Sequence, residues 1–220
     1  MSNLPKVIIF DFDGTLVHYH FDFLIEQTHR VFGLLNVEPV SDSYLKDCFS
    51  DFDYFRFAEK SSDPEFIKHF WHKFDWSKLP FPEPFSCTEQ TLGFLKSLGI
   101  KLAVATARYN KDHDFVQIIE EVGISHYFDC IVARESEEQD WKDKDPQITN
   151  LVNFFKVDRS DIWFVGDVPA DVISSKKANL GRSVAVLSGG IKRAVLEKTD
   201  PDYIFDDIGS LIELFNRSGE

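Results

Sequence analysis

The sequence has few cysteines, no long apolar run and no secretion signal. Its three cysteines, Cys48, Cys87 and Cys130, lie far apart without any Cys-x-x-Cys spacing, which excludes a disulfide framework and a cysteine zinc cluster. No apolar stretch approaches the roughly 20 residues that span a bilayer. The N-terminus lacks the charged, apolar and small-residue order of a signal peptide. We therefore expect free thiols, no membrane partner and a cytoplasmic location.

Basic residues are also scarce. The 220 residues include 24 Lys and Arg against 37 Asp and Glu, giving a net charge of −13. A surface this negative repels nucleic-acid phosphates, so no nucleic-acid partner is expected. The 43% hydrophobic content is that of an ordinary globular protein, which excludes disorder. The length suits one domain with a smaller insert.

Short apolar runs alternate with helical patterns along most of the chain. Each run ends in polar or glycine residues, as a buried strand does when it enters a loop. Gly99 and Gly123 each follow a segment whose apolar residues have helical spacing, and each is expected at the C′ position that ends the helix. Asp145-Pro146 is expected to supply the N-cap and the first-turn proline of another helix. This alternation predicts an α/β fold, a Rossmann-like parallel sheet with helices on both faces. The expected strands are 7–10, 101–105, 130–133, 162–165 and 184–187.

One segment breaks the alternation. Residues 17–85 contain three helical stripes and no convincing strand, and residues 17–84 hold half of the aromatic residues. A proline-rich stretch at 80–84 closes the segment. We therefore expect an α/β core formed by residues 1–16 and 86–220, and a helical insert formed by residues 17–85. Core packing is the simplest role for the aromatic residues, and a few of them lining a ligand pocket is the alternative.

Two acidic residues follow the first expected strand in the sequence Asp11-Phe12-Asp13-Gly14-Thr15-Leu16. Side chains alternate along a strand, so Asp11 and Asp13 are expected to point toward the same small volume. Two like charges about 4 Å apart repel by roughly 4 kcal/mol at an effective dielectric constant of 20. Such a pair requires a raised pKa on one carboxyl group or a cation between them.

A second acidic motif, Gly166-Asp167-Val168-Pro169-Ala170-Asp171, follows another buried strand. Asp167 lies at the strand end, and Asp171 is expected in the first turn of a helix that begins at Pro169. Because the carboxyl ends of parallel strands meet at one sheet edge, both motifs are expected to meet there. Several carboxylate oxygens gathered at one sheet edge are typical of a Mg²⁺ site.

With these motifs the chain resembles the haloacid dehalogenase (HAD) superfamily, in particular its phosphatases with a helical cap and, among them, the phosphoglycolate phosphatase-like group. The resemblance covers roughly residues 6–215 and implies that the insert is the cap domain. The matching positions are Asp11-x-Asp13-Gly14-Thr15 for the first motif, Thr106 for the second, a lysine before the helix at 146 for the third, and Gly166-Asp167-x-x-x-Asp171 for the fourth.

The resemblance implies roles for the two acids of the first motif. Asp11 would be the nucleophile that forms an aspartyl-phosphate. Asp13 would protonate the leaving alcohol and later take a proton from water. An acid at position 13 favours cleavage of a phosphoester over cleavage of a carbon–halogen bond, because the dehalogenases of the superfamily lack it. Mg²⁺ would be bound by the carboxylates of Asp11 and Asp167 and the backbone carbonyl of Asp13, and Asp171 would bind it or orient its ligands.

The third motif and the substrate contacts leave alternatives open. The segment Trp141-Lys142-Asp143-Lys144-Asp145-Pro146 departs from the usual Lys-Pro-x-Pro, and the distance to Asp167 favours Lys142 as the catalytic lysine over Lys144. Arg108 can reach a substrate phosphate or carboxylate, but a surface arginine fits equally well. Ser188-Gly189-Gly190 most simply forms a turn into a helix, and a phosphate-binding loop is the weaker alternative. The predicted catalytic residues are Asp11, Asp13, Thr106 and Lys142, and the predicted substrate-binding residues are Thr106, Ala107, Arg108 and Lys144.

The sequence thus predicts an Mg²⁺-dependent phosphatase that hydrolyses a small phosphorylated metabolite, phosphoglycolate-like or a sugar phosphate, as a monomer or homodimer. A phosphomutase or phosphonate hydrolase on the same scaffold is the alternative among enzymes. A non-catalytic, phosphate-responsive regulatory protein is the alternative of another class, and the large insert argues against it.

Overall fold

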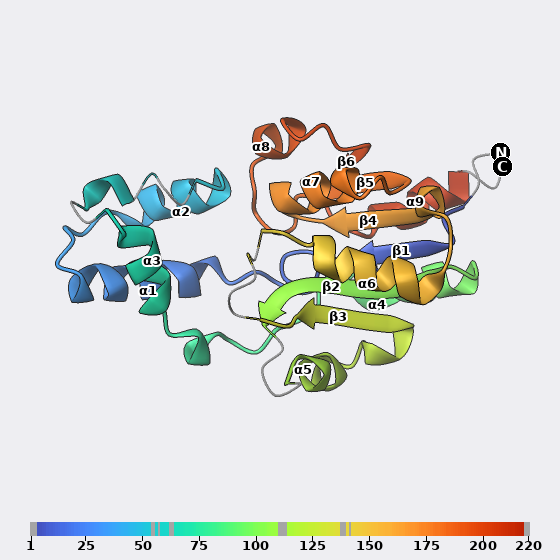
Figure 1. Cartoon of the computed structure of the whole chain (residues 1–220), viewed down its shortest axis with the longest axis horizontal. Helices are drawn as coiled ribbons and strands as arrows, with labels where there is room; N and C mark the ends of the chain where they lie inside the picture. Colours follow the sequence, from blue (N-terminus) through green and yellow to red (C-terminus); the bar gives the residue numbers. More distant parts are fainter. Residues whose placement is uncertain are drawn as a thin grey trace. The chain divides into compact units, whose positions relative to one another are not determined.

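The chain divides into two compact units. In the computed structural model, one unit comprises Met1–His18 and Pro82–Glu220, and the other comprises Tyr19–Phe81 (Figure 1). The structure describes residues 4–53, 56, 58–61, 64–109, 114–136, 140 and 142–217. Within these residues, no helix is both long enough and apolar enough to cross a lipid bilayer.

The first unit is an α/β fold built on a six-stranded sheet in the order β3-β2-β1-β4-β5-β6. All five strand pairs are parallel, and the order reverses direction between β1 and β4. The predicted Rossmann-like parallel sheet is therefore confirmed. The strands are β1 (Val7–Phe10), β2 (Lys101–Tyr109), β3 (Cys130–Arg134), β4 (Ile162–Gly166), β5 (Arg182–Val186) and β6 (Tyr203–Phe205).

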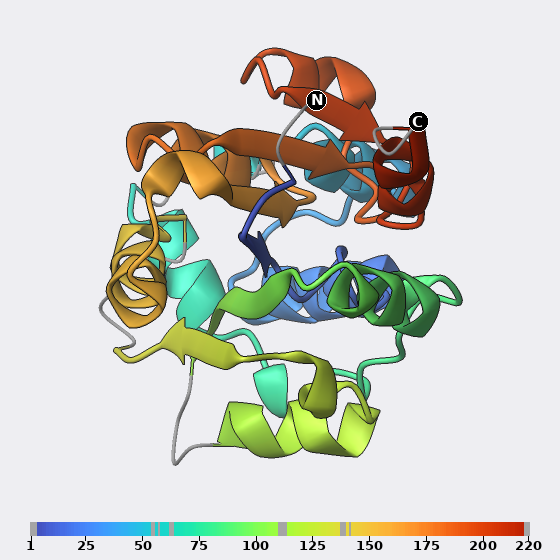
Figure 2. The same cartoon turned by 90° about the vertical axis from the view of Figure 1, so that its right-hand side faces the viewer.

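Helices cover both faces of the sheet. Ile8 and Phe10 of β1 belong to the core on the face covered by α4, α5 and α9. Val7 and Ile9 pack on the opposite face, under α6. Figure 2 shows α6 on one side of the strands and α4 and α9 on the other. The helices of this unit are α4 (Thr88–Ser97), α5 (Asp114–Val122), α6 (Asp145–Phe155), α7 (Pro169–Lys177), α8 (Arg193–Glu197) and α9 (Ser210–Arg217).

The register of the central strands sets the position of the residues that follow them. Phe10, the last residue of β1, pairs with Val104 of β2 and Val165 of β4. The backbone N–H of Asp11 donates to the carbonyl of Val165 at 2.8 Å. The chain leaving β1 is therefore held against the end of β4, at the point where the strand order reverses.

Several expected boundaries need correction. Strand β6 escaped prediction because it has three half-buried residues and no strong apolar run. Strand β2 continues through Thr106 to Tyr109 instead of ending at residue 105, with an irregular register against β3 beyond Ala105. Helix α6 has Lys144, not Asp145, at its N-cap position.

The second unit contains α1 (Phe21–Leu34), α2 (Asp42–Ser50) and α3 (Phe66–His72), and the described part of it has no strand. The Ser41 hydroxyl accepts from the N–H of Tyr44 at 3.2 Å, which caps α2. Phe32 packs on Phe66 and Phe70, and all three rings are buried. These rings form a core, in agreement with the simplest interpretation of the aromatic residues.

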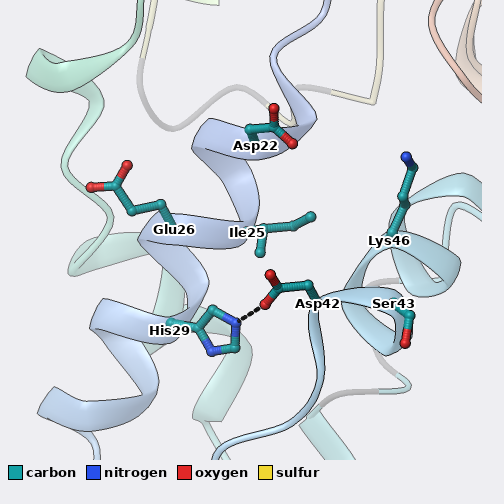
Figure 3. A pocket seen from close by; sticks show the side chains of 7 residues that line it. All are labelled: Asp22, Ile25, Glu26, His29, Asp42, Ser43 and Lys46. Carbon is teal, nitrogen blue, oxygen red and sulfur yellow. Dashed lines mark hydrogen bonds and ion pairs between the residues drawn. The ribbon is translucent and has the colours of Figure 1, made fainter.

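A groove of about 430 Å³ lies between α1 and α2 within this unit (Figure 3). His29 lies 2.7 Å from Asp42 across it. None of the residues predicted to be catalytic or metal-binding lines this groove. Its lining residues are Asp22, Ile25, Glu26, His29, Asp42, Ser43 and Lys46.

Candidate active site

Three buried carboxylates meet at the carboxyl ends of β1 and β4. One oxygen from each of Asp11, Asp167 and Asp171 lies within 4.8 Å of the others. Asp11 follows β1, Asp167 follows β4, and Asp171 lies in the first turn of α7. In open parallel sheets ligands bind at this switch point, outside the carboxyl ends of the strands.

The start of α7 holds Asp171 in place. Pro169 is the first residue of the helix, as the sequence predicted, and Asp171 is the third. One Asp171 oxygen accepts from the N–H of Val168 at 3.1 Å. The positive end of the helix stabilises this carboxylate. Asp167 is also buried, and its Oδ1 accepts from the Thr15 hydroxyl at 3.2 Å.

Two glycines leave room for the Asp167 carboxylate. A Cβ atom at Gly14 or Gly189 would overlap its Oδ2 atom, and Gly14 also has a left-handed φ of +77°. The Ser188 hydroxyl donates to the carbonyl of Gly14 at 2.6 Å and joins the two loops. The glycine sequence Ser188-Gly189-Gly190 predicted a turn into a helix, and no local signal marked the packing of Gly189 against Asp167.

Lys144 joins two of the three carboxylates. Its Nζ lies 2.6 Å from Asp11 Oδ1 and 2.6 Å from Asp171 Oδ1, and the residue is only 2% exposed. Its backbone N–H donates to the Ser174 hydroxyl of α7 at 3.3 Å. The N-cap position of α6 thus projects the lysine into the cluster.

This placement bears on the choice between the two lysines. The interval to Asp167 favoured Lys142, but Lys144 is the lysine that contacts Asp11 in the described part of the chain. Lys142 lies two residues earlier, where its backbone N–H donates to Asp140 at 3.0 Å. Spacing along an irregular loop does not fix which side chain turns inward, whereas the N-cap position of a helix packed on the sheet does.

Burial and mutual repulsion shape the electrostatics of the cluster. Burial raises the pKa of Asp11 to about 7, with Asp171 and Asp13 adding to the effect and Lys144 opposing it. The pKa of Asp167 is raised well above its ordinary value by burial and by the neighbouring charges of Asp11 and Asp171. Burial alone would lower the pKa of Lys144, but the charges of Asp11 and Asp171 raise it.

The donor set fits a divalent cation. Asp11, Asp167 and Asp171 are buried around one lysine, so ionising all three leaves negative charge without a partner. The raised pKa values of Asp11 and Asp167 express this deficit. Carboxylate oxygens gathered within a few ångströms are the ligands of Mg²⁺ and similar hard cations. The cluster is therefore suited to hold a metal ion.

Asp13 forms an ion pair with Arg108. Its two oxygens accept from the Nε and a terminal nitrogen of Arg108 at 2.7 and 2.6 Å. The Asp13 side chain does not belong to the buried cluster of Asp11, Asp167 and Asp171. Side chains alternate only within a strand, and β1 ends at Phe10, so the alternation rule does not reach Asp13, although its charge is close enough to contribute to the raised pKa of Asp11.

The remaining predicted residues lie on the extension of β2. The Thr106 hydroxyl accepts from the N–H of Arg108 at 3.1 Å, and Ala107 between them is half-buried. Gln147 of α6 donates from Nε2 to the Thr106 carbonyl at 3.2 Å. Both Thr106 and Gln147 are buried. No motif in the sequence marked Gln147, because its role depends on the packing of α6 beside β2.

A Rossmann-like parallel sheet with buried acids and a lysine at its switch point is the arrangement of an α/β enzyme that binds its ligand at the carboxyl ends of the strands. The model of the family "Haloacid dehalogenase-like hydrolase" matches residues 8–186. The chain belongs to this family of enzymes, as the sequence motifs indicated.

Relatives of known name cover nearly the whole chain. A phosphoglycolate phosphatase of Neisseria meningitidis is 29% identical over 96% of this chain and 92% of its own. A pyrophosphatase, PpaX, of Bacillus mycoides is 22% identical over 96% of this chain and 97% of its own. The structure of a haloacid dehalogenase-like hydrolase from Streptococcus pneumoniae has a TM-score of 0.74 and 20% identity, covering 98% of this chain and 100% of that one. The last similarity shows the same fold.

Proposed function

We propose that the protein is an Mg²⁺-dependent phosphatase that hydrolyses a small phosphorylated metabolite through an aspartyl-phosphate on Asp11. The observation that carries this proposal is the contact of Asp11 with Lys144 at 2.6 Å, beside two further buried carboxylates at the switch point of the sheet. The phosphoglycolate phosphatase and pyrophosphatase among the relatives support it, because both names denote cleavage of a phosphate bond.

Asp11 would act as the nucleophile. Its oxygen attacks phosphorus, a bond from phosphorus to Asp11 forms, and the bond to the leaving oxygen breaks. Lys144 orients the carboxylate and offsets negative charge on the transferred phosphoryl group. The Thr106 oxygen accepts from the Arg108 N–H, so its own hydroxyl hydrogen is available to donate to a phosphoryl oxygen.

Asp13 would serve as the acid and then the base. As an acid it gives a proton to the leaving oxygen, and as a base it takes one from the water that attacks the aspartyl-phosphate. Its side chain is the most exposed of the four acids that the sequence singled out, with 26% accessible against 10% for Asp11 and 1% for Asp171. Asp13 is therefore the acid with access to an entering leaving group.

Mg²⁺ would be held by the carboxylates of Asp11 and Asp167 and the backbone carbonyl of Asp13, with Asp171 binding it or orienting its ligands. When bound, the ion supplies positive charge that offsets the repulsion between Asp11 and an incoming phosphate dianion. Lys144 alone cannot balance three buried acids, and this imbalance supports the assignment.

We assign the cap role to the unit Tyr19–Phe81. A cap excludes bulk water during phosphoryl transfer and contributes to the choice of substrate. A cytoplasmic location and a monomeric or homodimeric state remain predictions of the sequence.

The test is phosphate release from phosphoglycolate, pyrophosphate and a panel of sugar phosphates, with and without Mg²⁺, by the unchanged protein, Asp11→Asn and Asp13→Asn. Turnover that needs Mg²⁺ and is lost in both variants supports the proposal. A single stoichiometric phosphorylation without turnover would indicate a regulatory protein. Conversion of a sugar phosphate to its isomer without release of phosphate would indicate a phosphomutase.

A further inference from the structure

Gln147 is a buried polar residue in the first turn of α6 that takes no direct part in the proposed chemistry. Glutamine side chains are mostly exposed in proteins, but this residue is only 2% exposed. Its Nε2 donates to the Thr106 carbonyl at 3.2 Å. A buried amide group is favourable only when it is hydrogen-bonded, so this bond holds the side chain against β2.

The Thr106 carbonyl lies where the pairing of β2 is irregular. The register of β2 against β3 is regular up to Ala105 and is recovered only at Tyr109. On the other side of β2, strand β1 already ends at Phe10. A regular ladder pairs each carbonyl, whereas a carbonyl in an irregular stretch needs another donor, because burying it unpaired is costly. Gln147 supplies such a donor from α6.

The start of α6 also carries Lys144. Lys144 is the N-cap residue and Gln147 is the third residue of the helix, and a separation of three residues brings two side chains to one side of a helix. Lys144 contacts Asp11 after β1, and Gln147 contacts Thr106 on β2. Since β1 and β2 are neighbours in the sheet, the start of α6 fixes the ends of two adjacent strands relative to each other.

The Gln147 bond acts on the peptide group that joins Thr106 to Ala107. This group is planar and trans, so fixing its carbonyl also fixes the opposite direction of the Ala107 N–H. The Arg108 N–H donates to the Thr106 hydroxyl oxygen at 3.1 Å, which ties the hydroxyl to the backbone two residues later. Gln147 holds the peptide between these two points. Rotation of this peptide would therefore redirect both the hydroxyl and the Ala107 N–H.

We propose that Gln147 is a positioning residue, which aims the Thr106 hydroxyl and the Ala107 N–H at the phosphoryl oxygens by holding the peptide between them on α6. This inference rests on the proposed phosphatase function. Donors that stabilise charge in a transition state are effective when they are fixed before the reaction begins. Gln147 acts through Thr106 and does not itself touch the substrate.

The first test removes the amide donor and keeps the length of the side chain. For Gln147→Met with Mg²⁺ and the best substrate of the panel, we expect kcat to fall by roughly 10- to 100-fold, because a misplaced donor loses part of what a deleted one loses. KM should change by less than about threefold, since the lost interaction belongs to the transition state. An unchanged kcat would overturn the inference and leave the phosphatase in place.

Gln117→Met is the matched control. Gln117 lies exposed on α5, where its Nε2 donates to Glu121 at 3.0 Å, so the same chemical change is made away from the site. This variant should keep the kcat of the unchanged protein. If Gln147→Met fails to fold, Gln147→Glu takes its place, because it keeps the shape of the side chain and replaces the donor by an acceptor when ionised.

A double-mutant cycle separates positioning from a general effect on folding. Thr106→Val removes the hydroxyl that Gln147 is proposed to aim. In this background the loss of kcat caused by Gln147→Met should be at least about threefold smaller, because only the Ala107 N–H remains to be positioned. A loss by the same factor in both backgrounds would show that Gln147 does not act through the Thr106 hydroxyl, and would overturn the inference.

Failure of the phosphatase proposal has a different signature, namely no phosphate release by the unchanged protein from any substrate. Binding of orthovanadate, a tetrahedral anion like phosphate, then tests Gln147 in the presence of Mg²⁺. Vanadate should raise the Tm of the unchanged protein and of Gln117→Met, and Gln147→Met should lose at least about half of this rise. Equal rises in the three proteins, or no rise in the unchanged protein, would overturn the inference.

Discussion

Lys144 Nζ lies 2.6 Å from Asp11 Oδ1, although the two residues come from loops far apart in the sequence. The lysine stands at the start of α6 and the aspartate at the end of β1. The same ammonium group lies 2.6 Å from Asp171, so one cation orients two acids at once. A site built this way is sensitive to the loss of any one of the three charges.

Replacement of Lys144 tests the choice between the two lysines. Lys144→Met leaves Asp11 and Asp171 buried without their cation, so we expect kcat to fall by at least about 100-fold and the metal-free protein to lose on the order of 3 kcal/mol of stability. Lys142→Met is the matched control, and its fall in kcat should be at least tenfold smaller than that of Lys144→Met. Steady-state kinetics and thermal unfolding of both variants measure this, and the reverse order would restore Lys142 to the catalytic role.

The raised pKa of Asp11 predicts how the stability of the metal-free protein depends on pH. The folded protein holds this proton up to about pH 7, whereas the unfolded chain releases it near its ordinary value of 3.8. Between these values the unfolded state binds fewer protons, so the free energy of unfolding falls as pH rises. Asp11→Asn removes this penalty. With EDTA present, we measure how far the Tm of Asp11→Asn lies above that of the unchanged protein. This Tm difference should be larger at pH 8 than at pH 5, by on the order of 5 °C. A difference independent of pH would refute the prediction.

Addition of Mg²⁺ is expected to stabilise the folded protein, because the ion binds the assembled cluster and not the unfolded chain. At 100 times its dissociation constant, a ligand of this kind contributes about 2.7 kcal/mol, or roughly 5–10 °C in Tm. Asp167→Asn should lose most of this gain. Asp200→Asn, an acid that is 96% exposed on the surface, is the control and should keep it. Equal gains in the two variants would place the metal elsewhere.

Gly189→Ala tests the fit of the loops around Asp167. The added methyl group would overlap the Asp167 carboxylate, so we expect weaker Mg²⁺ binding by at least about tenfold, together with lower activity. Gly33→Ala is the control, because nothing lies within 4 Å of its added Cβ and it sits in helix α1. This second change should raise stability by up to about 1 kcal/mol. Metal titrations followed by thermal unfolding compare the two, and an unchanged Mg²⁺ affinity in Gly189→Ala would argue against a role for the loop.

The parallel sheet could be predicted from the sequence because its central strands are short, apolar and flanked by polar turns. Strands β1, β3 and β4 were found within one residue of the expected bounds, whereas β2 runs to Tyr109 and β5 covers Arg182–Val186 instead of 184–187. The C′ residues Gly99 and Gly123 both have a left-handed φ. Strand β6 lacked this signal, since only neighbours in the folded sheet make its three residues a strand.

The acidic pairs show the limit of local patterns. Asp167 and Asp171 were placed correctly, because a strand end and a helix start are local features with their own sequence signals. The partner of Asp13 had no such local signal, because the alternation rule stops where β1 stops and Arg108 is supplied by β2.

The sequence by itself determined the alternation of the first five strands with helices, the family, and the acids that follow β1 and β4. These depend on apolar periodicity and on short motifs, which act over a few residues. Only the tertiary structure decided that Lys144 contacts Asp11, that Arg108 holds Asp13, and that Gly14 and Gly189 make room for Asp167. Such contacts join segments distant in the chain, and their geometry is set by how helices and loops pack on the sheet.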